Sequence, residues 1–480
     1  MQLTYTYADE LQALTSSVKV KPLYKQRLAM VNDVLASELQ IPAHFWQPEN
    51  WQSALFDPNS DWQKKAVAQK YGGHQFGHWN PHLGDGRGHL LAEIVDRHGV
   101  RHDLHLKGAG DTPYSRHADG RAVLRSSIRE YMVSEAMCAL GIPTSRALCL
   151  FTSEDPVQRE QLERGAMLIR TCPSHIRFGH FEYYHHSQQI DALKSLFDYC
   201  FTHLFKTQAD AENPYLALFD EIVSNTASMI ANWQAIGFNH GVMNTDNMSI
   251  HGITFDYGPY AFLDDYIPSF VCNHSDHTGR YAFDQQPSIA LWNLNALAQA
   301  FTPYLSVEQL TSSLQHFQPL VTRLFHAALM KKMGLNAISE EHPQYEQALS
   351  IQAQWLAMLK TQRRDYTVSF RLLQHAGKSP EKIIDHFVDR AAASNWLKQY
   401  LPLTERCETD FTSLATVNPA VIPRNHHLQQ AISAAEQDDF SMCEALFTAI
   451  STPFDPEHDS GMFASAPPES GKGIALSCSS

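Results

Sequence analysis

Five residues spread along the 480-residue chain have the types and the order needed to bind a phosphate-rich ligand. The run GDGRG begins at Gly84, and main-chain N–H groups can approach phosphate oxygens where side chains are absent. Lys107 follows 23 residues later and supplies a point charge, while Glu130 offers a carboxylate to fix that lysine. Asn247 and Asp256 offer hard oxygen ligands for Mg²⁺. The pattern predicts a phosphate site assisted by a metal ion.

The surrounding patterns predict the elements that position these residues. Residues 84–107 contain a glycine turn and two apolar stretches separated by a short turn, which indicates a β-hairpin ending on Lys107. Residues 121–140 have apolar residues at helical spacing and carry Glu130. Further strands are predicted at 147–152 and 166–170. Helices are predicted at 24–39, 190–204, 214–233, 287–302, 306–333, 340–362 and 379–399.

The order of glycine loop, hairpin lysine, helical glutamate and distant metal loop is that of a protein-kinase-like fold. We therefore expect an α+β protein with a kinase-like bilobal fold, in which a small β-rich N-lobe precedes a larger helical C-lobe. The expected divisions are an N-terminal extension (1–64), a nucleotide-binding N-lobe (65–180), a C-lobe with the catalytic and metal loops (181–400) and a C-terminal extension with a flexible tail (401–480).

The predicted catalytic loop lacks the usual aspartate of a kinase. Against the H-G-D-x-x-x-x-N pattern, His240 and Asn247 align, but the aspartate position is Val242. Valine cannot accept a hydroxyl proton. Asp246, immediately before Asn247, is a carboxylate that could take over. The chain is therefore either inactive or has moved its chemistry.

Charged residues near the predicted phosphates also differ from those of an ordinary kinase. Asp85 within the glycine loop would repel phosphates placed in the normal way, whereas Arg87 would attract them. Arg170 and Arg177 add two guanidinium groups suited to gripping a polyphosphate by bidentate contacts.

Long runs of the chain resemble the selenoprotein O (YdiU) family of protein adenylyltransferases. The resemblance covers essentially the whole chain through the runs YGGHQFGHWNPHLGDGRG, HLKGAGDTPYSRHADGRAVLRSSIREY, HGVMNTDNMSIHGITFDYGP and the terminal SCSS. It implies that ATP binds in a kinase-like cleft in reversed orientation. AMP, rather than phosphate, would then be transferred to Ser, Thr or Tyr hydroxyls of protein substrates.

The resemblance also implies residue roles. Asp246 falls on the catalytic base, Asn247 and Asp256 on the ligands of Mg²⁺ or Mn²⁺, and Glu130 on the partner of Lys107. The positions that fall on nucleotide contacts are Gly84, Gly86, Arg87, Lys107, Asp119, Gly120, Arg170, Arg177 and Asp256.

The sequence leaves several choices open. Mg²⁺ and Mn²⁺ accept the same oxygen ligands, and UTP is an alternative to ATP as co-substrate. Two other functions remain, namely a phosphotransferase that uses Asp246 as a displaced base, and a non-catalytic pseudokinase that binds nucleotide and a partner.

The composition excludes several classes of protein. With 44% hydrophobic and 18% charged residues, the chain is globular rather than disordered. The formal net charge of −14 repels phosphate backbones, so we expect no nucleic-acid partner. No stretch approaches the roughly 18 apolar residues that span a bilayer, and the first residues lack the features of a signal peptide. We expect a cytoplasmic monomer with no membrane partner.

Eight cysteines include no C-x-x-C pair, which disfavours a zinc cluster and a disulfide scaffold. Cys272 has polar neighbours, and Cys478 lies in a Pro/Gly/Ser-rich tail, so neither has the apolar periodicity of a core cysteine. The resemblance places Cys478 where eukaryotic members carry selenocysteine. We interpret the two as a candidate redox pair, with unpaired bystander thiols as the alternative.

Two pairs of adjacent histidines could suggest a metal site, His185-His186 and His426-His427. Side chains of adjacent residues diverge on any regular element, so we expect no metal site at either pair.

Overall fold

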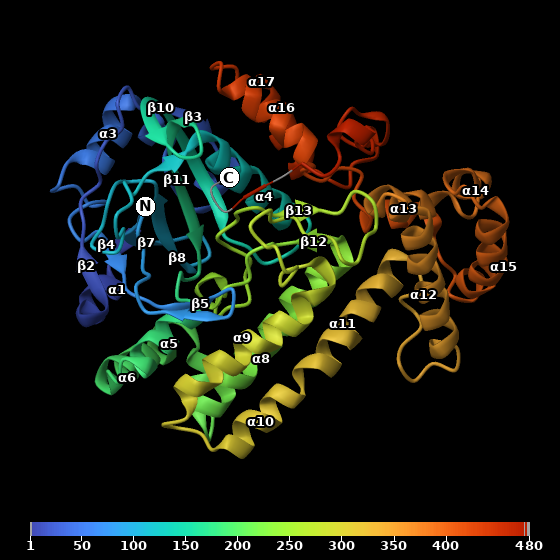
Figure 1. Cartoon of the computed structure of the whole chain (residues 1–480), viewed down its shortest axis with the longest axis horizontal. Coiled ribbons are helices and arrows are strands. Elements are labelled where there is room, and N and C mark those ends of the chain that lie inside the picture. The colour runs from blue at the N-terminus through green and yellow to red at the C-terminus, as the bar shows by residue number, and fades with distance from the viewer. Residues whose placement is uncertain (1, 475, 478–480) are drawn as a thin grey trace.

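An antiparallel sheet built from the first third of the chain dominates one side of the protein (Figure 1). The computed structural model describes residues 2–474, 476 and 477. The strand order is β2-β4-β7-β8-β11-β10-β3, with β1 pairing β7 and β9 pairing β11. The strands are β1 (Gln2–Thr4), β2 (Thr15–Ser17), β3 (Arg27–Val31), β4 (Val67–Gln69), β7 (Gly88–Val95), β8 (Arg101–Lys107), β9 (Ala122–Val123), β10 (Arg146–Gln158) and β11 (Leu162–Cys172).

The predicted hairpin that ends on Lys107 is confirmed as β7 and β8. Its turn is closed by the Asp96 carboxylate, which accepts hydrogen bonds from the backbone N–H groups of His98 and Val100 at 2.8 and 2.9 Å. The register pairs Gly88 with Lys107, so the glycine loop and the lysine lie side by side. Strand β11 pairs with the other edge of β8.

The predicted helix that carries Glu130 is also confirmed. Helix α4 (Leu124–Ala139) packs against β10 and β11 and is buried over most of its length, with apolar residues such as Ile128 and Met132 beside the buried Glu130. Helices α16 (Asn425–Ala435) and α17 (Ser441–Ser451) return from the C-terminal end and pack on α4, where Phe447 contacts Tyr131 with ring centroids 5.2 Å apart. The C-terminal segment therefore braces the helix that holds Glu130.

Residues after the sheet are mainly helical (Figure 1). Helix α8 (Pro214–Ile236) is capped at its start by Asn213, whose side chain accepts a hydrogen bond from Leu216 N, and is stopped by Gly237 with φ +72, three residues beyond the predicted end at 233. No helix in the described part of the chain is long and apolar enough to cross a membrane. The other helices are α1 (Thr6–Glu10), α2 (Asp33–Glu38), α3 (Pro48–Phe56), α5 (Phe178–His186), α6 (Ile190–Tyr199), α7 (Lys206–Ala209), α8 (Pro214–Ile236), α9 (Gln286–Phe301), α10 (Val307–Gln315), α11 (Phe317–Lys332), α12 (Tyr345–Gln362), α13 (Tyr366–Leu372), α14 (Glu381–His386) and α15 (Arg390–Arg406).

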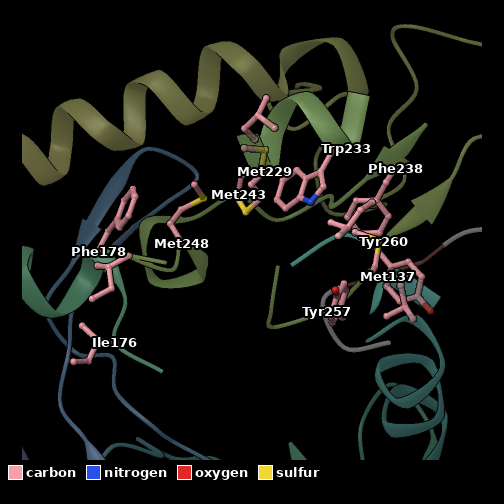
Figure 2. Close-up of a cluster of buried hydrophobic side chains, with 14 of the residues drawn as sticks. Met137, Ile176, Phe178, Met229, Trp233, Phe238, Met243, Met248, Tyr257 and Tyr260 are labelled. Carbon is pink, nitrogen blue, oxygen red and sulfur yellow. The ribbon is translucent and has the colours of Figure 1, made fainter. Parts of the chain in front are cut away.

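A buried apolar cluster supports the loop between residues 238 and 262. Figure 2 shows Trp233 of α8 beside Phe238 and Tyr260, and Met243 and Met248 from the loop itself. Asn293 of α9 donates to the Met243 carbonyl oxygen at 3.0 Å. Short strands β12 (Phe238–Asn239) and β13 (Ala261–Phe262) close the loop. The core thus fixes both ends of the segment that carries Asp246, Asn247 and Asp256.

One predicted element has the wrong type, and two predicted helices are each divided in two, 306–333 into α10 and α11 and 379–399 into α14 and α15. The helix expected over 24–39 is replaced by strand β3, followed by the short helix α2. Asn32 caps α2 by accepting a hydrogen bond from Leu35 N, and β3 pairs with β10 at the edge of the sheet. Pairing with a distant strand outweighs the local helical pattern here. The predicted α+β class is confirmed, with a large antiparallel sheet and a mainly helical second half.

Candidate active site

A cleft of about 760 Å³ lies between the glycine loop of the sheet and the segment 242–259. This volume is within the range of small-molecule sites, about 300–1,000 Å³. The cleft brings together every residue that the sequence assigned to nucleotide, metal or base, namely Gly84, Gly86, Arg87, Lys107, Asp119, Gly120, Arg170, Arg177, Asp246, Asn247 and Asp256. Glu130 is buried behind the residues that line the cleft and accepts a hydrogen bond from Lys107.

The glycine loop needs glycine where it passes Tyr114. Gly84 has φ +130, and a Cβ atom there would lie 2.6 Å from Tyr114 Cγ. Asp85 is among the residues that line the cleft, but its carboxylate is buried. Its buried carboxylate accepts hydrogen bonds from Gln69 N at 3.0 Å and from the Tyr71 hydroxyl at 3.3 Å. Through these hydrogen bonds Asp85 anchors the glycine loop to the core, a role that the sequence did not predict.

Lys107, Glu130 and Arg170 form one buried ion network. Lys107 Nζ donates to Glu130 Oε2, and Arg170 Nη1 donates to Glu130 Oε1 at 2.9 Å. Burial alone would raise the pKa of Glu130, but the two adjacent cations outweigh it and hold that pKa below its usual value. Glu130 is therefore ionised and keeps both cations in fixed positions.

Asp256 is held by two arginines. Arg170 Nη1 donates to Oδ1 at 2.5 Å, and Arg177 donates to Oδ2 from Nη2 at 2.8 Å and from Nε at 3.2 Å. Burial acts to raise the pKa of Asp256, yet Arg170 and Arg177 hold it well below the usual range. The residue has φ +58, a conformation that aspartate tolerates better than most residues. Asp256 is therefore an anionic oxygen donor at neutral pH.

Asp246 differs from Asp256 in its surroundings. It is 9% exposed, and its Oδ2 accepts a hydrogen bond from Gln75 Nε2 at 3.2 Å. Its Oδ1 receives no hydrogen bond from any described residue. Burial raises the pKa of Asp246 to about 7. A carboxyl with this pKa can accept a proton near neutral pH. Val242 also lines the cleft but offers no polar atom to do so.

Asn247 and Asp256 fit a hard divalent cation. The Asn247 side-chain NH₂ donates to the Val242 carbonyl oxygen at 3.1 Å, which leaves its amide oxygen as the ligand atom. One carboxylate and one amide oxygen, completed by phosphate oxygens, are the kind of ligand set that Mg²⁺ takes in nucleotide sites. The same oxygens would suit Mn²⁺.

Two cleft residues were missed from the sequence. Arg159 lines the cleft and makes a forked pair with Asp119, with both nitrogen–oxygen distances at 2.9 Å. It lies beside the tip of the β10–β11 hairpin, whose strands extend well beyond the predicted 147–152 and 166–170. Gln75, the donor to Asp246, lies in the run YGGHQFG, so the resemblance carried a signal that spacing alone did not.

The candidate redox pair is only partly described. Cys272 is 5% exposed, and its thiol donates to the Asn239 carbonyl oxygen at 3.6 Å. The inference from its polar neighbours that it lies outside the core is therefore wrong. Its Sγ packs under Gly241, where a Cβ atom would approach it to 2.5 Å. Cys478 lies outside the described residues.

An α+β scaffold with a glycine loop, a lysine–glutamate pair and two carboxylates in one cleft defines a transferase that handles phosphate esters. The chain belongs to the family described as protein adenylyltransferase SelO, whose sequence profile matches residues 1–451. It is thus an enzyme of the nucleotidyltransferase class.

Similar proteins extend over the full length of the chain. A protein nucleotidyltransferase YdiU of Pseudoalteromonas atlantica is 49% identical over 488 residues, covering 100% of both chains. Proteins of the same name from Vibrio vulnificus and Vibrio parahaemolyticus are 44% and 45% identical, each covering at least 98% of both chains.

Proposed function

We propose that this enzyme transfers AMP from ATP to Ser, Thr or Tyr hydroxyls of protein substrates. The chain would form a kinase-like pair of lobes, 65–180 and 181–400, with extensions at 1–64 and 401–480. The glycine loop and Lys107 come from the sheet and Glu130 from α4, which packs on it, whereas Asp246, Asn247 and Asp256 come from the helical half, which supports this division.

The observation that carries the proposal is the position of the cations. Arg170 and Arg177 are 3% and 1% exposed, and with Lys107 they place three cationic side chains at the floor of the cleft, where Glu130 and Asp256 are their partners. The terminal phosphates carry most of the charge of ATP, so they are the groups that this floor would attract. With its terminal phosphates bound there, ATP lies in the reverse of its orientation in a kinase, and its α-phosphate faces the acceptor hydroxyl. Contacts to the rest of the nucleotide are assigned to Gly84, Gly86, Arg87, Asp119 and Gly120.

Asp246 would act as the general base of this reaction. The acceptor hydroxyl oxygen bonds to the α-phosphorus, and the bond from that phosphorus to the bridging oxygen of the β-phosphate breaks, so that pyrophosphate leaves. The hydroxyl proton passes to the Asp246 carboxylate. A pKa of about 7 suits this role, since the carboxylate form is then populated at neutral pH and still has affinity for the proton.

The cation held by Asn247 and Asp256 would neutralise phosphate charge as the leaving group departs. Lys107 and the two arginines add fixed positive charge to the same phosphates, which needs no reorganisation during the reaction. Glu130 keeps Lys107 in place through its hydrogen bond.

Labelled ATP tests the proposal directly. The full chain is incubated with a bacterial protein extract and with ATP labelled at either the α- or the γ-phosphate. Label retained on protein only from the α position is expected, with a mass increase of one AMP on Ser, Thr or Tyr. Label only from the γ position would instead identify a phosphotransferase, and label from neither a non-catalytic nucleotide-binding protein. Parallel reactions with α-labelled UTP decide the preferred nucleotide.

A further inference from the structure

Three potential metal ligands meet outside the lining of the cleft. His74 lies on the short strand β5 (Gly73–Gln75), which pairs with β6 (His78–Asn80), and Glu182 and His186 lie on α5. One nitrogen or oxygen atom from each of the three lies within 4.8 Å of the others. Glu182 and His186 are four residues apart, so they share one face of the helix. His74 Nδ1 lies 2.5 Å from Glu182 Oε2.

Glu182 is the unusual member of this group. Its side chain is fully buried, and Oε1 receives no hydrogen bond from any described residue. A buried oxygen without a donor is costly, because the hydrogen bonds that it made to water are not replaced. A cation bound between Glu182 and the two imidazoles would satisfy this oxygen.

Aromatic rings surround the group. Trp79 lies against both imidazoles, with ring centroids 5.2 Å from His74 and 4.5 Å from His186, and Trp292 lies 5.2 Å from His74. These rings form part of the surroundings of the two imidazoles, which remain partly exposed.

We propose that His74, Glu182 and His186 form a binding site for a divalent transition-metal ion such as Zn²⁺, separate from the cation held by Asn247 and Asp256. Two imidazoles and one carboxylate, with a fourth position for water, are a known zinc ligand set. Imidazole nitrogens suit zinc, whereas Mg²⁺ and Ca²⁺ prefer oxygen. Metal binding replaces the hydrogen bond between His74 and Glu182. With bonds of about 2.0–2.1 Å, tetrahedral ligand atoms stand about 3.3 Å apart, so the two side chains need only a small movement.

A metal ion at this site would restrain β5, the strand that contacts Asp246. The backbone N–H of His74 donates to Thr245 Oγ1 at 2.7 Å, and its neighbour Gln75 donates to Asp246. On the other side of His74, a Cβ atom at Gly73 would lie 2.8 Å from Asp246 Oδ1, so strand and carboxyl are in close contact. A metal ion linking β5 to α5 would therefore limit movement of the strand that positions Asp246.

The sequence expectation for His185-His186 is thereby refined. The adjacent pair does not act as a unit, since the described ligand group includes His186 but not His185. His186 is instead joined by Glu182, one helical turn earlier, and by His74 from a segment more than 100 residues away. Neither partner could be identified from the adjacent pair alone.

Metal titration of the stripped full-length protein tests the site. The protein is freed of metal with a chelator and titrated with ZnCl₂ in excess Mg²⁺, which occupies oxygen-ligand sites. One zinc ion per chain is expected, with affinity at least about tenfold weaker in His186→Ala. His185→Ala, a change of the same type on the same helix, is the matched control and should bind as the wild type does. Equal binding by His186→Ala, equal loss in His185→Ala, or no stoichiometric binding by the wild type would overturn the proposal.

Two further measurements do not depend on enzyme activity or on folding of the variant. X-ray absorption of the zinc-loaded wild type should show nitrogen and oxygen ligands with scattering from two imidazoles. CoCl₂ should give the visible absorption of a four-coordinate ion. A spectrum with oxygen ligands alone would place the metal elsewhere and refute the assignment, whatever the outcome for AMP transfer.

Discussion

Arg177 donates two hydrogen bonds to a single oxygen of Asp256, from Nη2 at 2.8 Å and from Nε at 3.2 Å. Arg170 holds the other oxygen, so the carboxylate that would bind the metal neutralises the two arginines that would bind phosphates. Buried charges are tolerated only when they are paired in this way. Arrival of a metal–triphosphate complex would exchange these partners, with phosphates replacing Asp256 on the arginines and the cation replacing the arginines on Asp256.

This exchange predicts opposite effects of Asp256→Asn on two forms of ATP. Asparagine keeps the shape of the side chain but removes the charge, so affinity for the Mg²⁺ complex and the rate of transfer should fall, the rate by about 10²-fold or more. Metal-free ATP should bind as well as to the wild type or more tightly, because Arg170 and Arg177 are no longer neutralised. Calorimetric titration with ATP, in Mg²⁺ and in EDTA, measures both affinities.

Asp438→Asn is the matched control for that experiment. Asp438 also pairs with two arginines, Arg27 and Arg164, but at the exposed surface. Its replacement should change neither ATP affinity nor transfer. Unchanged transfer in Asp256→Asn would remove Asp256 from the site.

A second prediction separates charge from fold at the lysine–glutamate pair. Lys107→Met should abolish transfer with little loss of stability, because Glu130 keeps Arg170 as its partner. Glu130→Gln leaves buried Lys107 without its carboxylate partner and Arg170 with Asp256 alone, and should lower the free energy of unfolding by about 3 kcal/mol or more. Thermal or urea unfolding measured beside the transfer assay distinguishes the two.

Lys25→Met serves as the control for these variants, since Lys25 pairs with Glu154 at an exposed position. It should leave transfer and stability nearly unchanged. An unfolded Lys107→Met protein, or an active one, would show that the pair is structural rather than electrostatic.

The sequence correctly predicted the elements that are determined by residues close together in the chain. The hairpin ending on Lys107, helix α4 and the start of α8 were correct because turn residues, helical periodicity and an N-cap lie within a few residues of each element. Strand β3 was missed because its pairing with β10 joins residues more than 100 positions apart. No pattern within residues 24–39 reports that partner.

In the candidate site, too, short-range features were predicted and long-range contacts were not. Its residue types and order were predicted, but the directions of the side chains were not. Asp85 turns inward because Tyr71 and the backbone of Gln69 offer it donors, and Cys272 is buried because Gly241 leaves room above its sulfur. Both outcomes depend on contacts between distant segments, which spacing along the chain does not record.

A third prediction concerns the pH dependence that Asp246 produces. As a general base it must be ionised, so the transfer rate should rise with pH through about 7. Asp246→Asn should reduce transfer by about 10²-fold and remove this rise. Initial rates between pH 5.5 and 8.5, in the wild type and the variant, measure the effect.

The pH dependence of folding stability tests the pKa of Asp246 independently of the transfer rate. Its pKa in the folded protein is raised to about 7 from the usual 3.8, so the folded state holds a proton that the unfolded state has lost between these values. The contribution of Asp246 to stability is therefore full below pH 4 and lost as pH rises to 7. Asp246→Asn should consequently be more stable than the wild type at pH 8, by on the order of a few kcal/mol. A less stable variant would indicate a structural role in the turn instead.

The described end of the tail connects two segments that border the site. The backbone N–H of His274 donates to the Leu476 carbonyl oxygen at 2.6 Å, next to Cys272 in the chain. The Ser477 hydroxyl donates to Glu160 at 3.3 Å, at the tip of the hairpin beside Arg159, which lines the cleft. The tail thus contacts both the segment that carries Cys272 and the hairpin tip next to Arg159.

A redox tether is the last prediction. With oxidised glutathione as the electron acceptor, the thiols of Cys272 and Cys478 should lose two protons and two electrons and form a disulfide. That bond would fix the tail across the two segments that Leu476 and Ser477 contact. It would change the transfer rate because Cys272 packs against Gly241, which lies in the same run as Asn247. Mass mapping should find a cross-linked peptide that disappears on reduction and is absent from Cys478→Ser. Cys407→Ser, which removes a partly exposed thiol elsewhere in the chain, should keep it. Transfer that responds neither to reductant nor to Cys478→Ser would show that the two thiols have no regulatory role.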